Sequence, residues 1–354
     1  MNRPEDQIKS KALELGFDDC RITSAAAPES ADKLRAWLEA GRHGAMGYLE
    51  RNAEKRADPQ LVLEGARSIV TLAAAYSKFR RDPRRNPKAR PRPTIARYAR
   101  YTDYHDVLGD RLKLLTRFVD DLTNAEMRSL WYVDTGPLLE RDLAQRAGLG
   151  FVGKHTNLIS RRLGNWIFLS EIITTAELTP DEPETNHCGK CSSCIDACPT
   201  DAITGPFQLD SRLCISYLTI ELKGPIPEEL RPAVGHRIYG CDDCLEACPW
   251  NRFAQEGSLM KEHARDDLNQ PRLLELLQLD QAAFKSLFKG TPMLRTKRRG
   301  ILRNVCVALG NIGDETALPA LRRAAEDPEP LIAEHATWAI GQIASRTSPT
   351  NAAD

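Results

Sequence analysis

The stretch Cys188-Gly-Lys-Cys191-Ser-Ser-Cys194-Ile-Asp-Ala-Cys198-Pro199 decides the fold of this 354-residue chain. Its cysteines are separated by two, two and three residues and precede a proline, which is the spacing that holds 4Fe–4S clusters in bacterial ferredoxins. Three closely spaced thiolates suit one cubane, and the fourth thiolate, after a wider gap, serves a second cluster. A zinc site is the alternative, but zinc sites use two cysteine pairs and rarely end in Cys-Pro. The spacing therefore predicts two clusters.

An incomplete copy of this run follows at Cys241-Asp-Asp-Cys244-Leu-Glu-Ala-Cys248-Pro249. Its missing first position falls on Ile238, and Cys214 is the cysteine that is free to replace it. Because the last cysteine of each run ligates the other cluster, we predict two crossed sets. They are Cys188, Cys191, Cys194 and Cys248 for the first cluster, and Cys198, Cys214, Cys241 and Cys244 for the second. Two adjoining clusters would form a path for single electrons.

The remaining two of the ten cysteines are Cys20 and Cys306. Both lie among apolar residues in helix-like patterns, so we predict that they are buried packing residues. Disulfides are not expected in a large chain without an export signal.

Composition excludes an exported or membrane-spanning protein. The N-terminal residues MNRPEDQIKS are polar and lack both the apolar segment of a secretory signal and the arginine pair of a twin-arginine signal. No apolar run approaches the roughly 18 residues that span a bilayer. Acidic and basic residues balance at 49 each, so net charge indicates no partner. We therefore expect a cytoplasmic protein without a membrane partner.

The chain upstream of the cysteines alternates between helical and strand patterns. Helices are expected over residues 5–22, 31–40, 105–124 and 138–147, and strands over residues 68–76 and 129–133. A further strand pair, 156–160 with 166–174, is expected around Gly164-Asn165.

The C-terminal part contains an internal repeat. Ala308-Leu-Gly-Asn-Ile312 recurs as Ala339-Ile-Gly-Gln-Ile343, with a second helical segment between the two copies. This is a helical-hairpin repeat that resembles HEAT repeats, and with barely two units it must pack on the rest of the chain. We therefore predict an α+β protein of three domains. They are a mixed α/β domain over residues 1–180, a ferredoxin-like two-cluster domain over 181–255 and a HEAT-like domain over 256–354.

Two nucleotide-binding motifs are only approximated. Gly148-Leu-Gly150-Phe-Val-Gly153 has the spacing of the dinucleotide fingerprint, but it follows a helix rather than a strand. The same stretch lacks the Ser or Thr of a P-loop, because His155 follows Lys154. Neither nucleotide-dependent activity is expected.

A third motif, Asp103-Tyr-His105-Asp-Val-Leu-Gly109, approximates the Asp-x-His-x-x-Gly signature of proteins that bind cobalamin through histidine. It is one residue too long, so His105 is not assigned as a cobalt ligand and is expected to lie at a helix start.

Asp134 ends a predicted strand and begins the turn Asp134-Thr-Gly-Pro137. Taken alone, it is a turn-capping residue. Strand ends also present catalytic groups, and the apolar neighbours Trp131, Tyr132 and Val133 would raise the pKa of Asp134 and keep it protonated.

Together these motifs resemble those of the epoxyqueuosine reductase family. The similar stretches are Ala96-Arg-Tyr-Ala-Arg-Tyr-Thr-Asp-Tyr-His105, Val133-Asp-Thr-Gly-Pro-Leu-Leu-Glu-Arg141, Gly153-Lys-His-Thr-Asn-Leu-Ile159, Cys214-Ile-Ser-Tyr-Leu-Thr-Ile-Glu-Leu-Lys-Gly224 and Tyr239-Gly-Cys-Asp-Asp-Cys-Leu-Glu-Ala-Cys-Pro-Trp-Asn251. The chain departs from the family pattern at His155, Ser170 and Leu245, none of which is a cluster cysteine.

The resemblance implies an oxidoreductase that converts epoxyqueuosine to queuosine at the wobble position of a tRNA anticodon. It implies base-off cobalamin in the N-terminal domain with no histidine ligand, electrons from the two clusters, and Asp134 as the general acid that protonates the epoxide oxygen. Matching motif positions imply corrin contacts at Arg56, Arg97, Tyr98, Lys154, Asn157 and Ser160, with Asp242 approaching the other face of the corrin.

The implied substrate is a tRNA, and phosphate contacts need positive charge. Two basic segments could supply it, residues 80–92 and Arg295-Thr-Lys-Arg-Arg299, although both could instead be merely solvated. The expected tRNA contacts are Arg295, Lys297, Arg298 and Arg299. An external single-electron donor is expected as a partner, and the protein is expected to be a monomer.

Three other functions remain open from the sequence. A corrinoid reductive dehalogenase has similar clusters, but its respiratory members carry a twin-arginine signal. A pure iron–sulfur electron-transfer protein would need no cofactor in residues 1–180. A nucleic-acid-binding module would use its clusters only structurally.

Overall fold

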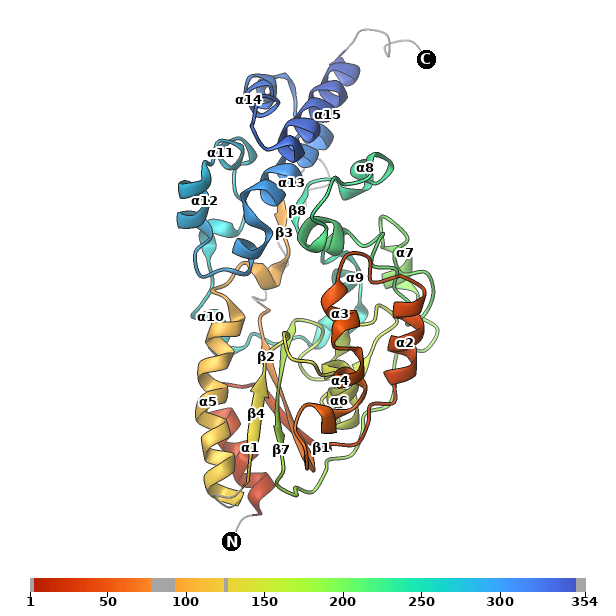
Figure 1. Cartoon of the computed structure of the whole chain (residues 1–354), viewed down its shortest axis with the longest axis vertical. Coiled ribbons are helices and arrows are strands. Elements are labelled where there is room, and N and C mark those ends of the chain that lie inside the picture. The colour runs from red at the N-terminus through yellow and green to blue at the C-terminus, as the bar shows by residue number, and fades with distance from the viewer. Residues whose placement is uncertain (1–2, 78–92, 124–126, 348–354) are drawn as a thin grey trace.

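The fold is described from a computed structural model of the chain, which describes residues 3–77, 93–123 and 127–347 (Figure 1). The predicted basic loop at residues 80–92 therefore lies outside the described residues. In the described part, no helix is both long and apolar enough to cross a membrane.

A four-stranded antiparallel sheet forms the centre of the N-terminal part. Its order is β1-β2-β7-β4, with bounds β1 Asp19–Ser24, β2 Ser68–Ala75, β7 Ile167–Thr174 and β4 Ser129–Tyr132. Every residue of β2 is buried, which confirms the predicted apolar strand at residues 68–76. Because the sheet is covered on both faces, β2 reads as a continuous apolar run rather than an alternating one.

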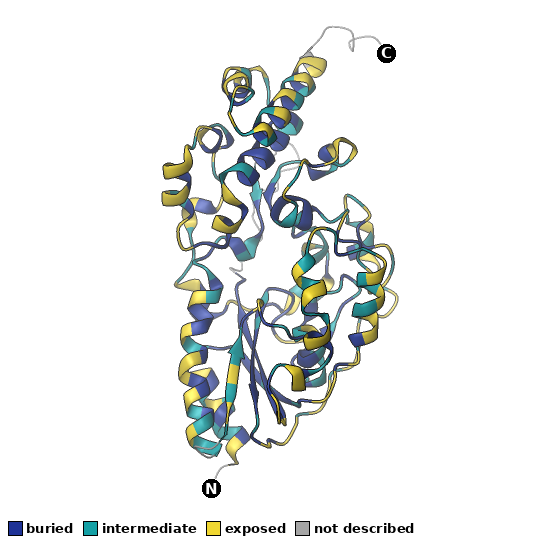
Figure 2. Ribbon diagram, in the orientation of Figure 1, coloured by how far each residue is buried: buried dark blue, intermediate teal, exposed yellow. Residues whose placement is uncertain are grey.

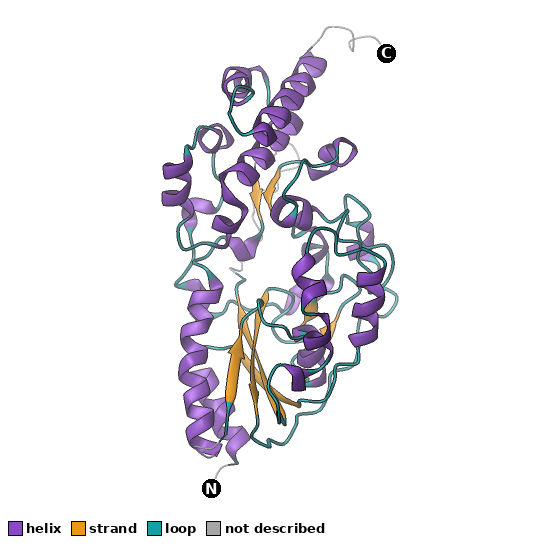
Figure 3. Ribbon diagram, viewed as in Figure 1, coloured by secondary structure: helices purple, strands orange, loops and turns teal. Residues whose placement is uncertain are grey.

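Helices pack on the two faces of this sheet (Figures 1 and 3). On one face, α1 (Pro4–Glu14) and α5 (Tyr104–Thr123) enclose a core that includes Leu72, Phe168 and Ile172. On the other face, α6 (Glu140–Arg146) packs against Ala73 and Ile173. Burial follows this arrangement: β2 is buried along its whole length, whereas the edge strand β4 and the outer side of α5 are partly exposed (Figure 2).

Two sequence predictions about local structure are wrong. The predicted helix over residues 5–22 ends at Glu14, because Gly16 takes a φ of 97° and the chain turns into β1. Cys20 therefore lies on a strand, although it is buried as predicted. The predicted pairing of 156–160 with 166–174 does not form, because β2 and β4 occupy both edges of β7.

The N-terminal part also contains two short strands and three helices outside the central sheet. The short strands β5 (Phe151–Val152) and β6 (Leu158–Ile159) pair with each other. The helices are α2 (Ala31–Glu39), α3 (Gly47–Arg51) and α4 (Ala53–Ala57), and α2 confirms the prediction at residues 31–40.

The cysteine segment contains two short helices, α7 (Ser193–Asp196) and α9 (Asp243–Glu246), and between them α8 (Arg231–Val234) and β8 (Arg237–Tyr239). Strand β8 pairs in parallel with β3 (Thr94–Ile95), so a piece of the N-terminal region joins the segment that follows it by more than one hundred residues. The predicted domain limits at 180 and 255 stay a prediction.

The C-terminal part is helical, with bounds α10 Ser258–Lys261, α11 Leu273–Leu277, α12 Gln281–Phe288, α13 Lys297–Ile312, α14 Leu318–Ala324 and α15 Pro330–Thr347. Helices α13 and α15 carry the two copies of the predicted repeat, and Cys306 is fully buried on α13.

Helix α13 also fastens the repeat to the cysteine segment. The buried Arg303 donates to the carbonyl oxygens of Leu218 and Leu222 at 2.6 and 2.8 Å, and Asn304 donates to that of Ile238 at 2.9 Å. Because buried polar groups stay only where they are satisfied, these bonds dock the repeat on the rest of the chain, as expected.

Candidate functional site

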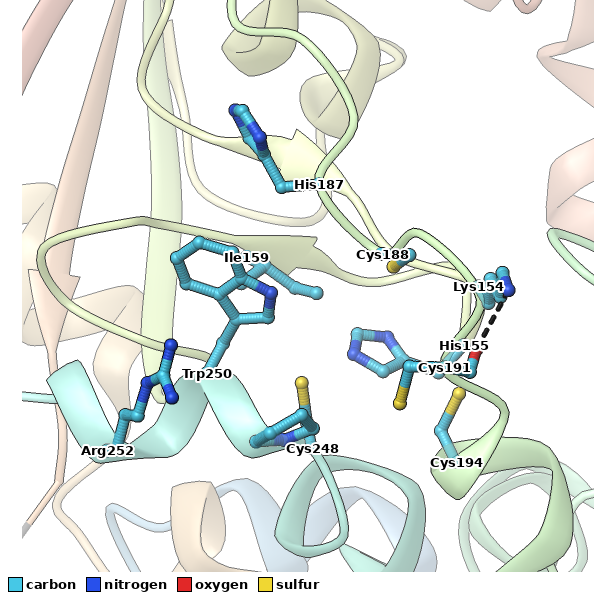
Figure 4. A pocket seen from close by; sticks show the side chains of 11 residues that line it. Lys154, His155, Ile159, His187, Cys188, Cys191, Cys194, Cys248, Trp250 and Arg252 are labelled. Carbon is cyan, nitrogen blue, oxygen red and sulfur yellow. Dashed lines mark hydrogen bonds between the residues drawn. The ribbon is translucent and has the colours of Figure 1, made fainter.

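The first predicted cysteine set lines one cavity. Cys188, Cys191, Cys194 and Cys248 border a space of about 260 Å³ together with Ile159 and Trp250 (Figure 4). Cys194 lies on α7, whereas Cys248 follows α9. The fold thus brings the last cysteine of the second run to the first three cysteines of the first run.

The second predicted set gathers around Cys244. Burial raises the pKa of the Cys244 thiol, and the neighbouring thiols of Cys241, Cys214 and Cys198 raise it further. Ser216 fastens the Cys214 segment to Cys241, because its Oγ accepts from the Cys241 amide at 3.0 Å. The distant Cys214 is therefore held beside the run from which one cysteine is missing.

Lys154 lies at the cysteine loop. Its Nζ donates to the carbonyl oxygens of Gly189 and Cys191, both at 2.8 Å, so this predicted corrin contact supports the loop of the first set (Figure 4). The buried Ser160 hydroxyl accepts from the amides of Arg162 and Leu163, each at 3.3 Å. The Asn157 carbonyl oxygen accepts from the Gly153 amide and so closes the turn between β5 and β6.

Asp134 lies just after β4 in a left-handed conformation, with a φ of 56°. Aspartate tolerates this region better than most residues. The following turn folds tightly over β4, because a Cβ on Gly136 would lie 2.5 Å from the Tyr132 ring. The Asp134 side chain is 53% exposed, so a strand end presents a carboxylate to the outside.

Two residues at the start of α5 surround this carboxylate. The Tyr104 hydroxyl donates to Asp134 Oδ2 at 2.7 Å, and His105 Nε2 lies 3.7 Å from the same oxygen. The other ring nitrogen of His105 lies 2.7 Å from Asp103 Oδ1. The imidazole is therefore held between two carboxylates.

The electrostatics contradict one expectation. Burial acts to raise the pKa of Asp134, as the apolar neighbours suggested, but His105, Tyr104 and Arg141 outweigh it and lower that pKa. For His105, burial acts to lower the pKa, but Asp103 and Asp134 raise it to about 9. At neutral pH, His105 is therefore protonated and Asp134 is ionised.

This balance gives a prediction for the His105 ring. We expect its NMR titration to give a pKa of about 9 in the intact protein, falling towards the ordinary value near 6.5 in Asp103→Asn. The Asp103 carboxylate favours the charged imidazole, and asparagine does not. A wild-type value at or below about 6.5 would contradict the assignment.

An aromatic row leads from Asp134 towards the cysteines. Tyr104 stacks on Phe168 with ring centroids 4.3 Å apart, and Phe168 contacts Tyr76 at 4.4 Å. Tyr76 packs on Trp166 at 6.1 Å, and the Arg97 guanidinium lies 4.2 Å above the Trp166 ring. The row thus ends on a predicted corrin contact.

Arg97 joins this row to the second cysteine set. Its backbone amide donates to Asp242 at 2.7 Å, and Asp242 is the neighbour of Cys241. Tyr98 packs edge-on against Tyr104, with centroids 6.1 Å apart. The structure therefore brings Arg97, Tyr98 and Asp242 together between Asp134 and the cysteines.

Comparisons with known proteins identify the family. The family described as "4Fe-4S double cluster binding domain" matches residues 187–251, "HEAT repeats" match residues 292–353, and "Epoxyqueuosine reductase QueG, DUF1730" matches residues 56–135. The epoxyqueuosine reductase of Xanthomonas campestris pv. campestris is 41% identical over 343 residues, covering 95% of this chain and 95% of the relative. The chain belongs to the epoxyqueuosine reductase family.

Solved structures of epoxyqueuosine reductases have the same fold. One, with an epoxyqueuosine-modified tRNA-Tyr stem loop, matches with a TM-score of 0.88 and 36% identity, covering 96% of this chain and 89% of that chain. Another, from Bacillus subtilis, has its Asp134 catalytic loop swung out of the active site and matches with a TM-score of 0.87 and 35% identity, covering 96% and 90%. The resemblance and the α+β fold class with its two-cluster and HEAT-like parts are confirmed.

In this epoxyqueuosine reductase family member, Arg56 holds the loop that carries Asp134. The buried Arg56 lies on α4, and its Nη1 donates to the Leu138 carbonyl oxygen at 3.0 Å. Arg56 thus supports the turn that follows Asp134 from its buried side.

The four predicted tRNA contacts have unlike surroundings in this family member. Arg298 forms an ion pair with Asp327 at 2.6 Å and donates to the Leu279 carbonyl oxygen at 2.7 Å, so it supports the helical repeat. Arg295 is 45% exposed and pairs with Glu221 at 2.7 Å. Lys297 is exposed, and Arg299 is partly buried.

Sequence reasoning missed Lys223. This exposed lysine lies near Arg295 and Lys297, whose positive charges add to burial in lowering its pKa. We name Lys223, Arg295 and Lys297 the basic edge. Tyr239 connects the basic edge to the site: its hydroxyl donates to the Pro292 carbonyl oxygen at 2.9 Å, in the turn that carries Arg295. The Tyr239 ring packs on Tyr98, which contacts Tyr104 beside Asp134.

Sequence reasoning also missed the roles of Tyr104 and His105. Asp103-Tyr-His105 stood out as a motif, but only as a possible cobalt-binding signature.

Proposed function

We propose that this chain reduces epoxyqueuosine to queuosine in the tRNA anticodon, with base-off cobalamin and two 4Fe–4S clusters. The observation that carries the proposal is the placement of Asp134 and its proton-bearing neighbour His105 on an aromatic row that leads to the cysteines. Removal of an epoxide oxygen as water consumes two electrons and two protons. The site combines a route for the electrons with a source of the protons.

The cysteines would deliver the electrons one at a time. We assign Cys188, Cys191, Cys194 and Cys248 to the first cluster, because they line one cavity. We assign Cys198, Cys214, Cys241 and Cys244 to the second, because they share one neighbourhood. Cys188 and Cys191 of the first set are partly exposed. Because Arg97 and Asp242 join the second set to the aromatic row, an external single-electron donor would approach the first cluster.

The groups between Asp134 and the cysteines fit a flat macrocycle with amide arms. The aromatic row offers an apolar surface for the macrocycle. The polar side chains of Arg97, Asp242 and Arg56 lie at its ends. Tyr98 and Asn157 complete the proposed corrin contacts. Lys154 and Ser160 belong to the same proposed set, although their polar atoms already hold loops. Bound cobalamin would supply the nucleophile that opens the epoxide.

Asp134 would deliver the proton to the opening oxygen. An alkoxide leaves poorly at neutral pH, so a positioned acid is needed at this step. The Asp134 carboxylate is ionised in the free protein, so it must first take up a proton. The imidazolium of His105, 3.7 Å away, can supply that proton. The catalytic loop named for an aspartate in the Bacillus subtilis relative supports this role.

The basic edge would hold the anticodon stem. A relative's structure contains an epoxyqueuosine-modified stem loop, and RNA helices are recognised largely through shape and phosphates. Because Tyr239, Tyr98 and Tyr104 connect the basic edge to Asp134, a stem bound there could place its modified base at the carboxylate.

We predict that Arg295→Gln with Lys297→Gln weakens tRNA binding and flattens its salt dependence. Each lost phosphate contact lowers the slope of log Kd against log salt by about one, so the slope should fall by about two. Cobalamin and iron contents should not change. Arg298→Gln is the matched control, because Arg298 is paired with Asp327 and its loss should reduce thermal stability more than tRNA affinity. An unaltered salt titration for the double variant would place the stem elsewhere.

The direct test is anaerobic reconstitution with iron, sulfide and cobalamin, followed by assay on tRNA that carries epoxyqueuosine. We expect queuosine to form only when a reductant, both clusters and cobalamin are present. Equal turnover without cobalamin would overturn the proposal, and so would full reduction of the clusters without any conversion of the tRNA.

A further inference from the structure

A buried histidine lines the cavity of the first cysteine set and has no role in the proposed function. His155 lies in the turn between β5 and β6, and only 3% of it is exposed (Figure 4). Its ring lies so close to Gly153 that a Cβ on that glycine would be 2.9 Å from Cε1 of the imidazole. Buried polar side chains need hydrogen-bond partners, and the partners of His155 lead to the segment of Cys248.

Four hydrogen bonds connect His155 to that segment. The Asn157 amide donates to His155 Nδ1 at 3.1 Å, and His155 Nε2 lies 3.0 Å from Asn165 Oδ1. Asn165 Nδ2 donates to Asn251 Oδ1 at 2.9 Å, and Asn251 Nδ2 donates to the Leu245 carbonyl oxygen. We name the side chains of His155, Asn165 and Asn251 the His155 relay.

The two ends fix the direction of every bond in the His155 relay. A backbone amide can only donate, so His155 Nδ1 carries no proton, and the neutral imidazole carries its proton on Nε2. Nε2 therefore donates to Asn165, whose NH2 group is left to donate to Asn251. A backbone carbonyl can only accept, and the NH2 group of Asn251 satisfies it at the other end. Each side chain thus accepts one bond and donates one, and the relay carries no charge.

The far end of the His155 relay encloses Cys248. The Cys248 amide donates to the same Leu245 carbonyl oxygen at 3.1 Å, and the Asn251 amide donates to the Cys248 carbonyl oxygen at 3.2 Å. At the near end lies Lys154, whose ammonium group holds the loop of the first run. The relay therefore joins the turn that supports the first run to the backbone on both sides of the crossed cysteine.

We propose that the His155 relay positions Cys248 as the crossed ligand of the first cluster and closes that side of the cluster to water. Spacing alone gathers Cys188, Cys191 and Cys194, but Cys248 reaches them only through the fold. Hydrogen bonds around metal ligands orient them and tune the metal. The three members of the relay are positioning residues, since none is a proposed ligand. The inference rests on the ligand assignment of the proposed function.

The first test is iron release from the reconstituted protein to a ferrous chelator. In His155→Ala, about half of the bound iron should leave about 10- to 100-fold faster than in the wild type, the usual cost of losing a partner of a metal ligand. The rest should leave at the wild-type rate. His155→Gln should resemble the wild type, because its terminal amide can still donate to Asn165. Wild-type release from His155→Ala, or no rescue by glutamine, would overturn the proposal.

Reduction potentials separate positioning from a general loss of stability. We expect a redox titration of His155→Ala, followed by electron paramagnetic resonance, to show a higher potential for the first cluster and an unchanged potential for the second. Water in place of the imidazole would stabilise the more negative, reduced state, and solvent exposure is one determinant of cluster potential. The signal that is missing from Cys248→Ala identifies the first cluster. Two unchanged potentials in His155→Ala would contradict the proposal.

The matched control is His335→Ala. His335 on α15 is also buried, accepts from the Ile226 amide at 3.2 Å and faces the Leu331 carbonyl oxygen at 2.7 Å, but it belongs to the helical repeat. Its loss should lower the melting temperature about as much as His155→Ala does, with the iron release and both potentials unchanged. Equal changes in the two variants would show that His155 only stabilises the fold.

A double-variant cycle tests the His155 relay as a unit. Asn251→Ala removes its far end, so this variant should release iron at least as fast as His155→Ala. Because both changes break one chain of hydrogen bonds, the double variant should be little faster than Asn251→Ala alone, whereas independent sites would multiply their effects. Multiplied effects would refute the relay. Survival of both clusters in Cys248→Ala would instead refute the ligand assignment, and this inference with it.

Discussion

Asp134→Asn is expected to fold, to bind cobalamin and both clusters, and to lose turnover about 10²- to 10⁴-fold, the usual cost of removing a general acid. The asparagine keeps the size of the side chain and can still accept from Tyr104. It cannot take a proton from His105 or deliver one to the opening oxygen. The rate of single-turnover conversion of epoxyqueuosine tRNA is the measurement that isolates this step.

The matched control for this variant is Asp142→Asn. Asp142 lies on α6 near the same turn, but it pairs with Arg146 and accepts from the Ser30 amide, so it supports the fold rather than the carboxylate. We expect it to retain turnover within a few-fold. If Asp134→Asn retained turnover equally well, Asp134 would return to the role of a turn-capping residue.

The gathering of the cysteines within each run could be predicted because their spacing is local. Within each run, thiols two or three residues apart are brought together by one turn of chain, whatever the rest of the fold does. The proposed place of Cys214 follows in the same way, because the incomplete second run leaves one position unfilled. The sequence did not reveal what holds the Cys214 segment in place. In the structure this is the hydrogen bond from the Cys241 amide to Ser216 Oγ.

The proton network could not be predicted in the same way. Tyr104 and Asp134 come from α5 and from the end of β4, and only the packing of α5 on the sheet brings them together. The apolar neighbours of Asp134 along the chain suggested a raised pKa, whereas the residues that decide it are its neighbours in space. The same holds for Arg298, whose partner Asp327 distinguishes it from the other members of a uniform basic run.

Cys214→Ala is expected to lower bound iron from roughly eight atoms per chain to nearer four and to abolish turnover. Cys214 is the proposed fourth ligand of the second cluster, and its alanine variant leaves that cluster with Cys198, Cys241 and Cys244 only. The first cluster should persist, because its four cysteines line a separate cavity. Iron analysis and electron paramagnetic resonance of the reduced protein measure both outcomes.

Two further variants make this test specific to the crossed assignment. Cys198→Ala should remove the second cluster although Cys198 belongs to the first run, and Cys248→Ala should remove the first although it belongs to the second run. Cys306→Ala is the control, because Cys306 is fully buried on α13 and should cost stability without loss of iron. Retention of full iron and both cluster signals in Cys214→Ala would mean that the second cluster has another ligand. Loss of the first cluster in Cys198→Ala and of the second in Cys248→Ala would rule out crossing.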